Sequence, residues 1–205
     1  TITINADGSY TFNPGTAFQY LNTGESTTTA ATYTLSDGHG GTDTATLTIT
    51  VTGINDGPTA VDDTNTTNES TSLNVTAANG VITPNDTDPE GQTLTVSAVN
   101  GVAGNVGASV AGSNGGTFTI AADGSYVFNP GTDFIGLAQG ETQTTSATYT
   151  IQDTLGLTST ATLTITVTGL NEAPVAVNDT NSTDQDTSLS VSAGSGVITP
   201  NDTDA

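Results

Sequence analysis

Threonine alternates with apolar residues in the clearest pattern of the chain, residues 42–52. Threonine stands at every even position of this segment, and the odd positions are Asp43, Ala45, Leu47, Ile49 and Val51. Because successive side chains of a strand point to opposite faces, this period of two predicts a strand with one apolar and one hydroxylated face. Residues 158–168 repeat the pattern. In that second strand we expect the inward-facing residues to be Ala161, Leu163, Ile165 and Val167.

A β-hairpin is predicted at residues 117–129. Two alternating runs flank the dipeptide Asp123–Gly124, a frequent hairpin turn, and their apolar residues are Phe118, Ile120, Tyr126 and Phe128. Asp7–Gly8 is the same turn near the start of the chain. Shorter alternating segments at 60–75, 94–99 and 147–152 are separated by Gly, Pro, Asn and Asp. This spacing favours an all-β fold, a Greek-key β-sandwich.

The chain repeats itself at an offset of 116 residues. Residues 6–88 recur without a gap at 122–204, and 58 of the 89 positions aligned between 1–89 and 117–205 are identical. Such a fixed period is the signature of a tandem array. We therefore expect an N-terminal segment (1–56) that is the C-terminal half of one repeat, a complete middle unit (57–172), and a C-terminal segment (173–205) that begins the next repeat. Only the middle unit is expected to close its own core.

The charge balance changes the picture most. The chain has 21 Asp and Glu residues and no Lys or Arg, so no carboxylate has a basic side chain to pair with. Two carboxylates 4 Å apart repel by about 4 kcal/mol at an effective dielectric constant near 20. Clustered acids therefore need metal ions, protons or wide spacing. Dissolved cations are the expected partner, and binding to nucleic acid or to an anionic membrane surface is excluded because both need Lys and Arg.

Other classes of site lose support from the composition. The chain has no cysteine, which excludes a disulfide framework and a thiolate site, and no apolar run long enough for a membrane span or signal peptide. Its one histidine, His39, corresponds to Leu155 in the second copy. No base or nucleophile recurs with the repeat, so we do not expect an enzyme.

Acidic residues gather in three loops of the middle unit. Asn55–Asp56 stands at its start, the Asp-Thr-Asp-Pro-Glu-Gly loop covers residues 86–91, and Asp153 precedes the last strand. Calcium takes six to eight hard oxygen ligands from flexible loops, so these loops could supply a calcium site. The competing explanation is that Asp and Asn form turns through their own backbone. Asp-Gly turns explain Asp7 and Asp123 in this way.

Two stretches carry a resemblance to a known family. Tyr-Thr-Leu-Ser-Asp-Gly-His-Gly-Gly at 33–41, followed by Thr-Ala-Thr-Leu-Thr-Ile-Thr-Val-Thr-Gly-Ile-Asn-Asp-Gly-Pro at 44–58, resembles the closing strands and linker of a cadherin-like repeat. It is more similar still to the cadherin-like (VCBS/Ig-like) repeats of giant bacterial RTX adhesins. The resemblance covers the whole chain and implies cadherin-like or Ig-like β-sandwich repeats in tandem, with calcium at the junctions between them.

The resemblance also implies ligands, carried over position by position. At the entrance of the middle unit these are Asn55, Asp56, Asp86, Asp88 and Asp153, and at the next junction they are Asn171, Glu172, Asp202 and Asp204. Further acidic residues are weaker candidates: Asp37, Asp62, Asp63, Glu69, Glu90 and Asp179. The match is incomplete, because Gly53 and Gly169 replace an Asp of the family's linker and Gln185 is the copy of Glu69.

The expected function is mechanical. We expect calcium-stiffened extender repeats of a secreted bacterial cell-surface adhesin, exported by a type I system, that project a distal binding domain in cell adhesion and biofilm formation. The expected partners are calcium ions and neighbouring repeats, with any cell-surface or glycan target held by other domains and no membrane insertion of this segment.

Two alternatives from other classes remain at this point. A calcium-dependent carbohydrate-binding accessory module would use exposed aromatic residues, but aromatics are 5% of the chain. Most of them, including Tyr10, Phe12, Tyr126 and Phe128, fall at predicted inward positions. An ice-binding surface would use the threonine rows as a flat hydroxylated face, although threonine also suits an ordinary solvent-facing strand.

Overall fold

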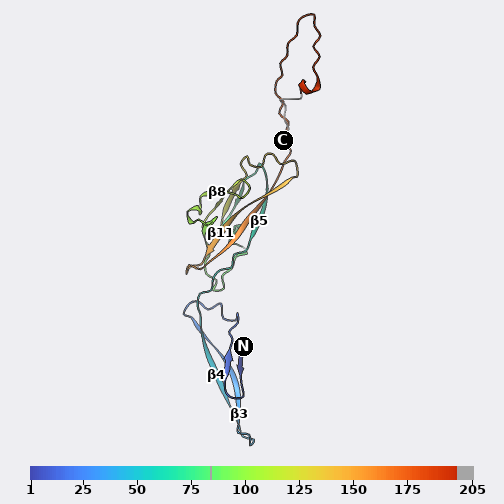
Figure 1. The fold of residues 1–205 in the computed structure, drawn as a ribbon. Helices are drawn as coiled ribbons and strands as arrows, with labels where there is room; N and C mark the ends of the chain where they lie inside the picture. The colour runs from blue at the N-terminus through green and yellow to red at the C-terminus, as the bar shows by residue number, and fades with distance from the viewer. Residues whose placement is uncertain (84, 198–205) are drawn as a thin grey trace.

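The computed structural model describes residues 1–83 and 85–197, and it is elongated (Figure 1). The N-terminal segment lies at one end, the middle unit in the centre and the C-terminal segment at the other end. The molecule is all-β, as the alternating patterns predict. Within the described ranges the only helices are three short 3₁₀ turns, η1 (Ala77–Asn79), η2 (Ala103–Asn105) and η3 (Ala193–Ser195). None of them is long or apolar enough to span a membrane.

Two four-stranded sheets build the middle unit. Their strands are β5 (Asp63–Asn68), β6 (Leu73–Val75), β7 (Thr95–Val99), β8 (Ser109–Ala111), β9 (Thr117–Ile120), β10 (Tyr126–Asn129), β11 (Thr142–Gln152) and β12 (Thr158–Thr168). One sheet has the order β6-β10-β9-β8 and the other the order β5-β12-β11-β7. Strands that are distant in the chain are therefore neighbours, which gives the crossed connections of a β-sandwich.

The first and last strands of the middle unit pair in parallel. Strand β5 pairs with β12 from Leu163↔Asp63 to Thr168↔Asn68, whereas all other ladders are antiparallel among the described strands. Because β5 and β12 run in the same direction, the linker before β5 and the linker after β12 leave the unit at opposite ends. The structure therefore separates an entrance end from an exit end.

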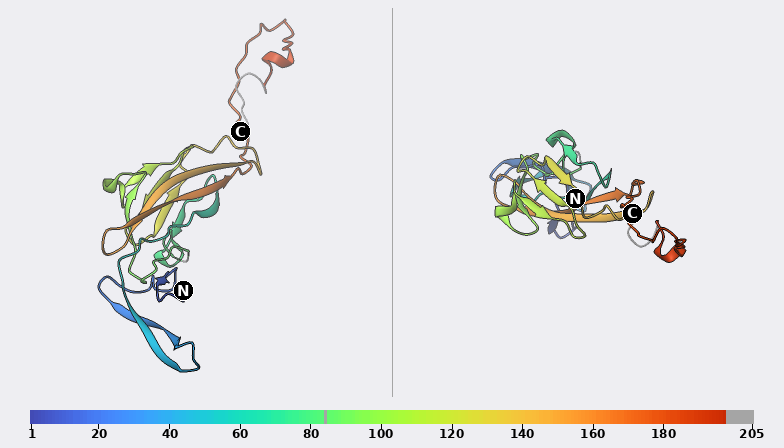
Figure 2. Two further views of the ribbon diagram at one scale, coloured as in Figure 1. Left: turned by 60° about the horizontal axis from the view of Figure 1, so that its bottom comes forward. Right: turned by 90° about the horizontal axis from the view of Figure 1, so that it is seen from above.

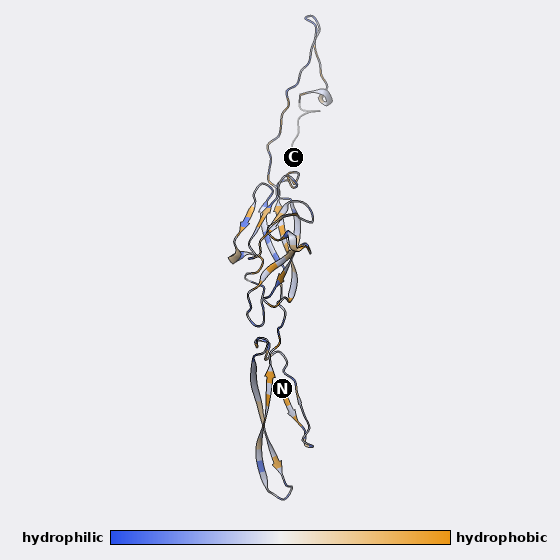
Figure 3. Ribbon diagram, turned by 90° about the vertical axis from the view of Figure 1, so that its left-hand side faces the viewer, coloured by the Kyte–Doolittle hydropathy of each residue, from blue (hydrophilic) through white to orange (hydrophobic). Residues whose placement is uncertain are grey.

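The core lies entirely inside the middle unit. Both sheets contribute large side chains that are fully buried, among them Phe118, Ile120, Phe128, Tyr149, Ile151, Leu163 and Ile165. The rings of Phe118 and Phe128 pack with centroids 4.9 Å apart. Outward positions of the same strands carry mostly threonine, so apolar and polar residues alternate along the ribbons (Figure 3). This is the predicted separation of an apolar and a hydroxylated face.

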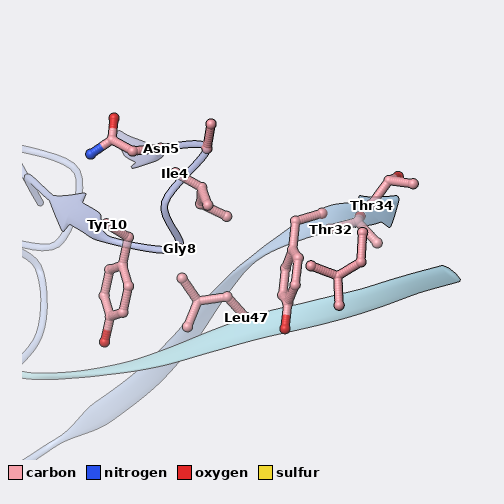
Figure 4. Close-up of a pocket in the computed structure, with 10 residues that line it drawn as sticks. Ile4, Asn5, Gly8, Tyr10, Thr32, Thr34 and Leu47 are labelled. Carbon is pink, nitrogen blue, oxygen red and sulfur yellow. The ribbon is translucent and has the colours of Figure 1, made fainter. Parts of the chain in front are cut away.

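In the N-terminal segment, the strands form but their apolar face stays open. Here β1 (Ile2–Ile4) pairs only with β2 (Tyr10–Phe12), and β3 (Ser26–Ser36) pairs only with β4 (Thr42–Thr52). Leu21 is its one buried hydrophobic side chain. Tyr10 lies on the inner side, where it lines a hollow with Tyr33 and Leu47 (Figure 4), but it is 53% exposed and is not part of a core as predicted.

The predicted strand bounds at 42–52 and 158–168 are confirmed residue by residue, and the hairpin at 117–129 is confirmed as β9 and β10. Gly124 has a positive φ of 84°, which only glycine adopts freely in such a turn. Two strands had no prediction. Strand β8 is three residues long, and β3 begins in a threonine run that lacks apolar alternation at its start.

The C-terminal segment projects beyond the middle unit (Figure 2). Among its described residues, 173–197, η3 is the only regular element of three residues or more. Its apolar side chains Val177, Leu189, Val191 and Val197 are each at least 42% exposed. The aligned residues 57–81 of the middle unit form β5, β6 and η1, whereas residues 173–197 form only η3 as an element of this length.

Candidate metal centre

The linker after β4 meets two loops at the entrance end of the middle unit. Asn55 Nδ2 donates a hydrogen bond of 2.7 Å to Asp153 Oδ2, and the backbone N–H of Asp56 donates one of 2.9 Å to Glu90 Oε1. Gln92 Nε2 also donates to Asn55 Oδ1. The structure thus brings the linker, the loop at 86–92 and the turn at Asp153 together, and these are the three acidic loops singled out from the sequence.

In the 86–92 loop, each carboxylate accepts hydrogen bonds through only one of its two oxygens. Asp86 Oδ1 accepts from the backbone N–H of Val61 at 2.8 Å, and Asp88 Oδ1 accepts from the N–H groups of Glu90 at 3.1 Å and Gln92 at 3.0 Å. The other oxygens, Asp86 Oδ2, Asp88 Oδ2 and Glu90 Oε2, are buried and have no hydrogen-bond donor in the described part of the chain. Three buried acceptors are therefore unsatisfied within one loop.

Asp153 is the most fully supported acid of the entrance end. It is 6% exposed, and its Oδ1 accepts from the backbone N–H of Leu155 at 2.8 Å and of Leu157 at 2.9 Å. Burial opposes its ionisation. The hydrogen bonds from Asn55, Leu155 and Leu157 outweigh that effect and hold its pKa below the ordinary value. Asp153 is thus an ionised acid that ties the linker to the turn before β12.

Asp63 and Asp86 are a pair of carboxylates with the opposite behaviour. Desolvation raises the pKa of Asp86 to about 6, with a further contribution from the negative charge of Asp63. The pKa of Asp63 is raised as well, chiefly by desolvation, although its oxygens accept from Tyr149 at 2.7 Å and from Asn85 at 3.0 Å. Both acids are partly desolvated, and the chain has no Lys or Arg that could pair with either of them.

These observations test whether calcium fits the entrance end. All the candidate ligand atoms are oxygens, which calcium prefers. The buried oxygens of the 86–92 loop that accept no hydrogen bond could bind a cation instead. The donor chemistry therefore fits. Within residues 1–83 and 85–197, however, no group of three or more Asp, Glu or His side chains lies close enough to hold a metal ion. The loops are neighbours, but they do not close a ligand set on one point.

Glu69 marks the exit end. It is 1% exposed, its backbone N–H donates to Thr168 O at 3.1 Å, and its Oε1 accepts from the N–H of Leu170 at 2.7 Å. Its Oε2 is buried without a hydrogen-bond donor among the described residues. Asn171 is exposed and Glu172 is half-buried beside it. Asp202 and Asp204 lie outside the described residues.

Of the weaker candidates, Asp37 and Asp179 lie apart from both groups, whereas Asp62 adjoins Asp63 and its negative charge adds to the raised pKa of that residue. Asp37 is in the turn before β4, so the eleven residues of that strand separate it from the linker. Asp62 Oδ1 accepts from the N–H of Thr162 at 2.8 Å and so supports the β5–β12 pair. Asp179 is exposed in the C-terminal segment.

Close packing explains why positions 53 and 169 are glycine. A Cβ on Gly53 would stand 2.4 Å from the carbonyl oxygen of Leu21, and one on Gly169 would stand 2.4 Å from that of Ala138. Real Cβ atoms do not approach backbone oxygens so closely, so neither copy has room for the family's Asp at this position. The departure noted from the sequence therefore reflects a close backbone contact that ends each long strand.

Sequence reasoning missed three residues of the entrance end. Gln92 bonds to Asn55 and to Thr154, Asn85 bonds to Asp63, and the Tyr149 hydroxyl lies 2.9 Å from Val61 O and 3.0 Å from Val81 O. Gln92 and Asn85 flank the acidic loop directly, and that adjacency was the available signal. The sequence held no such signal for Tyr149, because its place in an alternating segment predicts only a core residue.

Comparison with known proteins gives the following matches. The family model described as bacterial cadherin-like domain matches residues 55–169, and that of the bacterial Ig domain matches residues 1–50. No curated protein matches the chain significantly.

Among solved structures, extracellular cadherin domains 1–4 of protocadherin gamma B7 align at 17% identity and a TM-score of 0.42, over 91% of this chain and 44% of that one. Drosophila N-cadherin EC1–4 aligns at 14% identity and a TM-score of 0.42, over 84% of this chain and 40% of that one. A nucleoside hydrolase-related hypothetical protein from Saccharophagus degradans, associated with carbohydrate metabolism, aligns at 14% identity and a TM-score of 0.36. The alignment covers 55% of this chain and 26% of that one. The chain thus spans less than half the length of each.

Proposed function

Since the chain belongs to the bacterial cadherin-like domain family, which matches residues 55–169, we propose that it is a calcium-dependent spacer in an extracellular bacterial adhesin. Bacterial cadherin-like and Ig-like domains are usually extracellular structural modules of the adhesion type, and the tandem repeat agrees with that role. The finer proposal is that the repeats extend an RTX adhesin, leave the cell by type I secretion and hold a distal domain away from the surface during adhesion and biofilm formation.

One observation carries the calcium proposal. The loop at 86–92 leaves Asp86 Oδ2, Asp88 Oδ2 and Glu90 Oε2 buried without donors, at the place where it contacts the incoming linker. The chain has no Lys or Arg that could neutralise these acids. Calcium, when bound, would supply the positive charge that removes their repulsion.

The residues proposed as ligands come from three separate elements. They are Asn55 and Asp56 of the linker, Asp86, Asp88 and Glu90 of the loop, and Asp153 of the turn before β12. The bonds Asn55–Asp153 and Asp56–Glu90 already hold these elements together. A cation bound by all three would resist bending between the N-terminal segment and the middle unit. The exit end would do the same with Glu69, Asn171 and Glu172, together with Asp202 and Asp204.

A double substitution tests this assignment. In wild-type protein, calcium at about a hundred times its dissociation constant should raise the unfolding free energy by roughly 2.7 kcal/mol. Asp86→Asn with Asp88→Asn should remove most of this increase, because the amides keep the backbone hydrogen bonds but lose the charge. The measurement is thermal unfolding in EDTA and in millimolar calcium, with small-angle scattering of the same samples to follow extension.

The C-terminal segment offers a matched control. Asp184→Asn with Asp186→Asn changes the same charge at the same spacing on exposed residues, so the calcium response should be retained. A full calcium response in the Asp86 and Asp88 variant would refute the ligand assignment. A wild-type chain that calcium neither stabilises nor lengthens would refute the spacer mechanism as a whole.

A further inference from the structure

Two exposed apolar surfaces flank the linker between the N-terminal segment and the middle unit. One is Tyr20, which is 57% exposed in the loop 14–25, and the other consists of Leu155 and Leu157, which are 60% and 44% exposed in the turn 153–157. The two parts of the chain meet end to end at this linker (Figure 1). Exposed apolar side chains on adjoining ends lose contact with water if the ends come together, and this favours their contact.

The loop 14–25 is fixed to the start of the linker. The N–H of Gly53 donates to the carbonyl oxygen of Glu25 at 2.8 Å. A Cβ on Gly53 would stand 2.4 Å from the carbonyl oxygen of Leu21, the residue that follows Tyr20. Tyr20 is therefore held beside the last residue of the N-terminal segment.

The turn 153–157 is fixed to the linker just beyond that point. Asn55 Nδ2 donates to Asp153 Oδ2 at 2.7 Å, and a Cβ on Gly57 would stand 3.5 Å from the Cβ of Leu157. The four residue steps between positions 53 and 57 span at most about 14 Å. Both apolar surfaces thus lie along one short stretch of chain.

Ile54 is the hinge of this junction. It is the single residue between Gly53, which is bonded to the N-terminal segment, and Asn55, which is bonded to the middle unit. Because the peptide bonds are planar, the backbone can turn here only about single-bond dihedral angles. Rotation about ψ of Ile54 therefore bends the two ends toward each other without breaking either set of bonds.

The position of Tyr20 is also outside the core in a complete repeat. In the middle unit, which has both sheets, Gly136 takes the place of Tyr20. Gly136 is exposed and its neighbour Ile135 is 52% exposed, although Phe134 and Leu137 of the same loop are buried in the core. Covering strands therefore do not bury this position, and its side chain stays available to the next unit.

The two leucines are not needed to form their own turn. At the offset of 116, Leu155 corresponds to His39 and Leu157 to Gly41. In both copies an Asp at the start of the turn accepts from the N–H groups of these two positions, at 2.7–2.9 Å. The same turn thus forms with histidine and glycine, so the turn itself does not explain the apolar side chains at 155 and 157.

We propose that these three side chains form a latch across the junction: without a bound cation the chain bends at Ile54, and Tyr20 packs against Leu155 and Leu157. Removal of their apolar surface from water stabilises the bent conformer. The bend is directed, because only one side of the junction has the latch. The calcium-bound junction proposed above resists the same bend, and in that part the inference rests on the proposed function: latch and calcium favour different conformers, so each opposes the other.

Disulfide cross-linking tests the contact. The chain has no cysteine, so Tyr20→Cys with Leu155→Cys introduces its only two thiols. In EDTA and a glutathione redox buffer, this disulfide should form with an effective concentration at least tenfold above that of a control pair. The matched control is Tyr20→Cys with Asp123→Cys, because Asp123 is exposed in the β9–β10 turn, at the same end of the middle unit but on the other sheet. Mass spectrometry without reductant measures both pairs.

Fluorescence energy transfer follows the bend with the latch intact. Dyes on Asp43→Cys and Gln139→Cys report the distance between the far ends of the two parts, and both positions are exposed. In EDTA the otherwise unchanged chain should show a population with a short distance. Tyr20→Ser with Leu155→Ser should reduce that population at least threefold. Ile135→Ser is the matched control, since it removes an equally exposed apolar side chain at the exit end and should change nothing.

Two results would overturn the latch. One is cross-linking of the Tyr20 and Leu155 pair no stronger than that of the control pair, and the other is a short-distance population that the two serine substitutions leave intact. Both measurements are made in EDTA, so neither result bears on calcium binding. Calcium added to the same labelled sample should abolish the short-distance population. If it does not, the proposed spacer mechanism fails while the latch remains.

Discussion

Residues 1–56 and 117–172 are identical at 37 of 56 aligned positions, yet only the second copy has a core. Their long strand pairs even share one register, since Ser26↔Thr52 corresponds to Thr142↔Thr168 and Tyr33↔Ala45 to Tyr149↔Ala161. Tyr149 is nevertheless fully buried, while Tyr33 lines an open hollow. Alternation and turns are thus enough to pair neighbouring strands, but burial depends on strands that come from the other half of the repeat.

Truncating a buried aromatic ring should give the largest difference in stability loss between the two copies. Phe128 is fully buried against Phe118 and Phe134, so Phe128→Ala should lower the unfolding free energy of the middle unit by about 3–5 kcal/mol. The matched variant Phe12→Ala removes a half-buried ring of the N-terminal segment and should leave the unfolding transition of the middle unit unchanged. Urea unfolding followed by tyrosine fluorescence measures both, and equal losses would contradict the comparison.

Removing one hydroxyl should give a smaller difference of the same sign. The Tyr149 hydroxyl donates its one proton to Asp63 Oδ2 at 2.7 Å and also lies 2.9 Å from Val61 O and 3.0 Å from Val81 O, so Tyr149→Phe removes the hydrogen-bond donor from this site. We expect a loss of about 1–3 kcal/mol. Tyr33→Phe should have no effect, because the hydroxyl of Tyr33 has no such set of acceptors around it in the described structure. The same urea titration gives the result, and a neutral Tyr149→Phe would show that these bonds form only weakly in solution.

The pH dependence should be the smallest effect and should belong to the middle unit alone. The pKa of Asp86 rises from 3.8 to about 6 on folding, so the neutral form is favoured in the folded state. Its stabilising contribution is fully present below about pH 4 and is lost as the pH rises through 6. Since Asp86 is only partly buried, solvent screening reduces the change to about 1 kcal/mol.

Asp86→Asn should flatten this profile in EDTA. Thermal unfolding between pH 4 and 7 measures it, and the wild-type slope should also shrink in calcium if the ion binds at Asp86. Residues 1–56 contain no counterpart of Asp86, whose repeat partner is Asp202. A slope that Asp86→Asn leaves unchanged would assign the pH dependence to other acids, with Asp63 the first to test.

The sequence predicted much of the local structure and less of the site. Period-two alternation located β4 and β12, and a single Asp-Gly turn located the β9–β10 hairpin, because both signals are local. The linker and the acidic loops were also identified correctly as neighbours, through the family resemblance. Whether they close around an ion depends on side-chain positions that no pattern encodes. The unsatisfied oxygens, the raised pKa of Asp86 and the bridging role of Gln92 follow only from the three-dimensional contacts.

The parallel β5–β12 ladder also determines how the middle unit would respond to a pulling force. Tension applied through the two linkers draws β5 toward the entrance end and β12 toward the exit end, along the direction of the strands. All hydrogen bonds from Leu163↔Asp63 to Thr168↔Asn68 then carry load together, in shear, and none can open before its neighbours. An antiparallel pair pulled from one end would separate one bond at a time. The ladder between the first and last strands therefore acts as the clamp of the unit under tension.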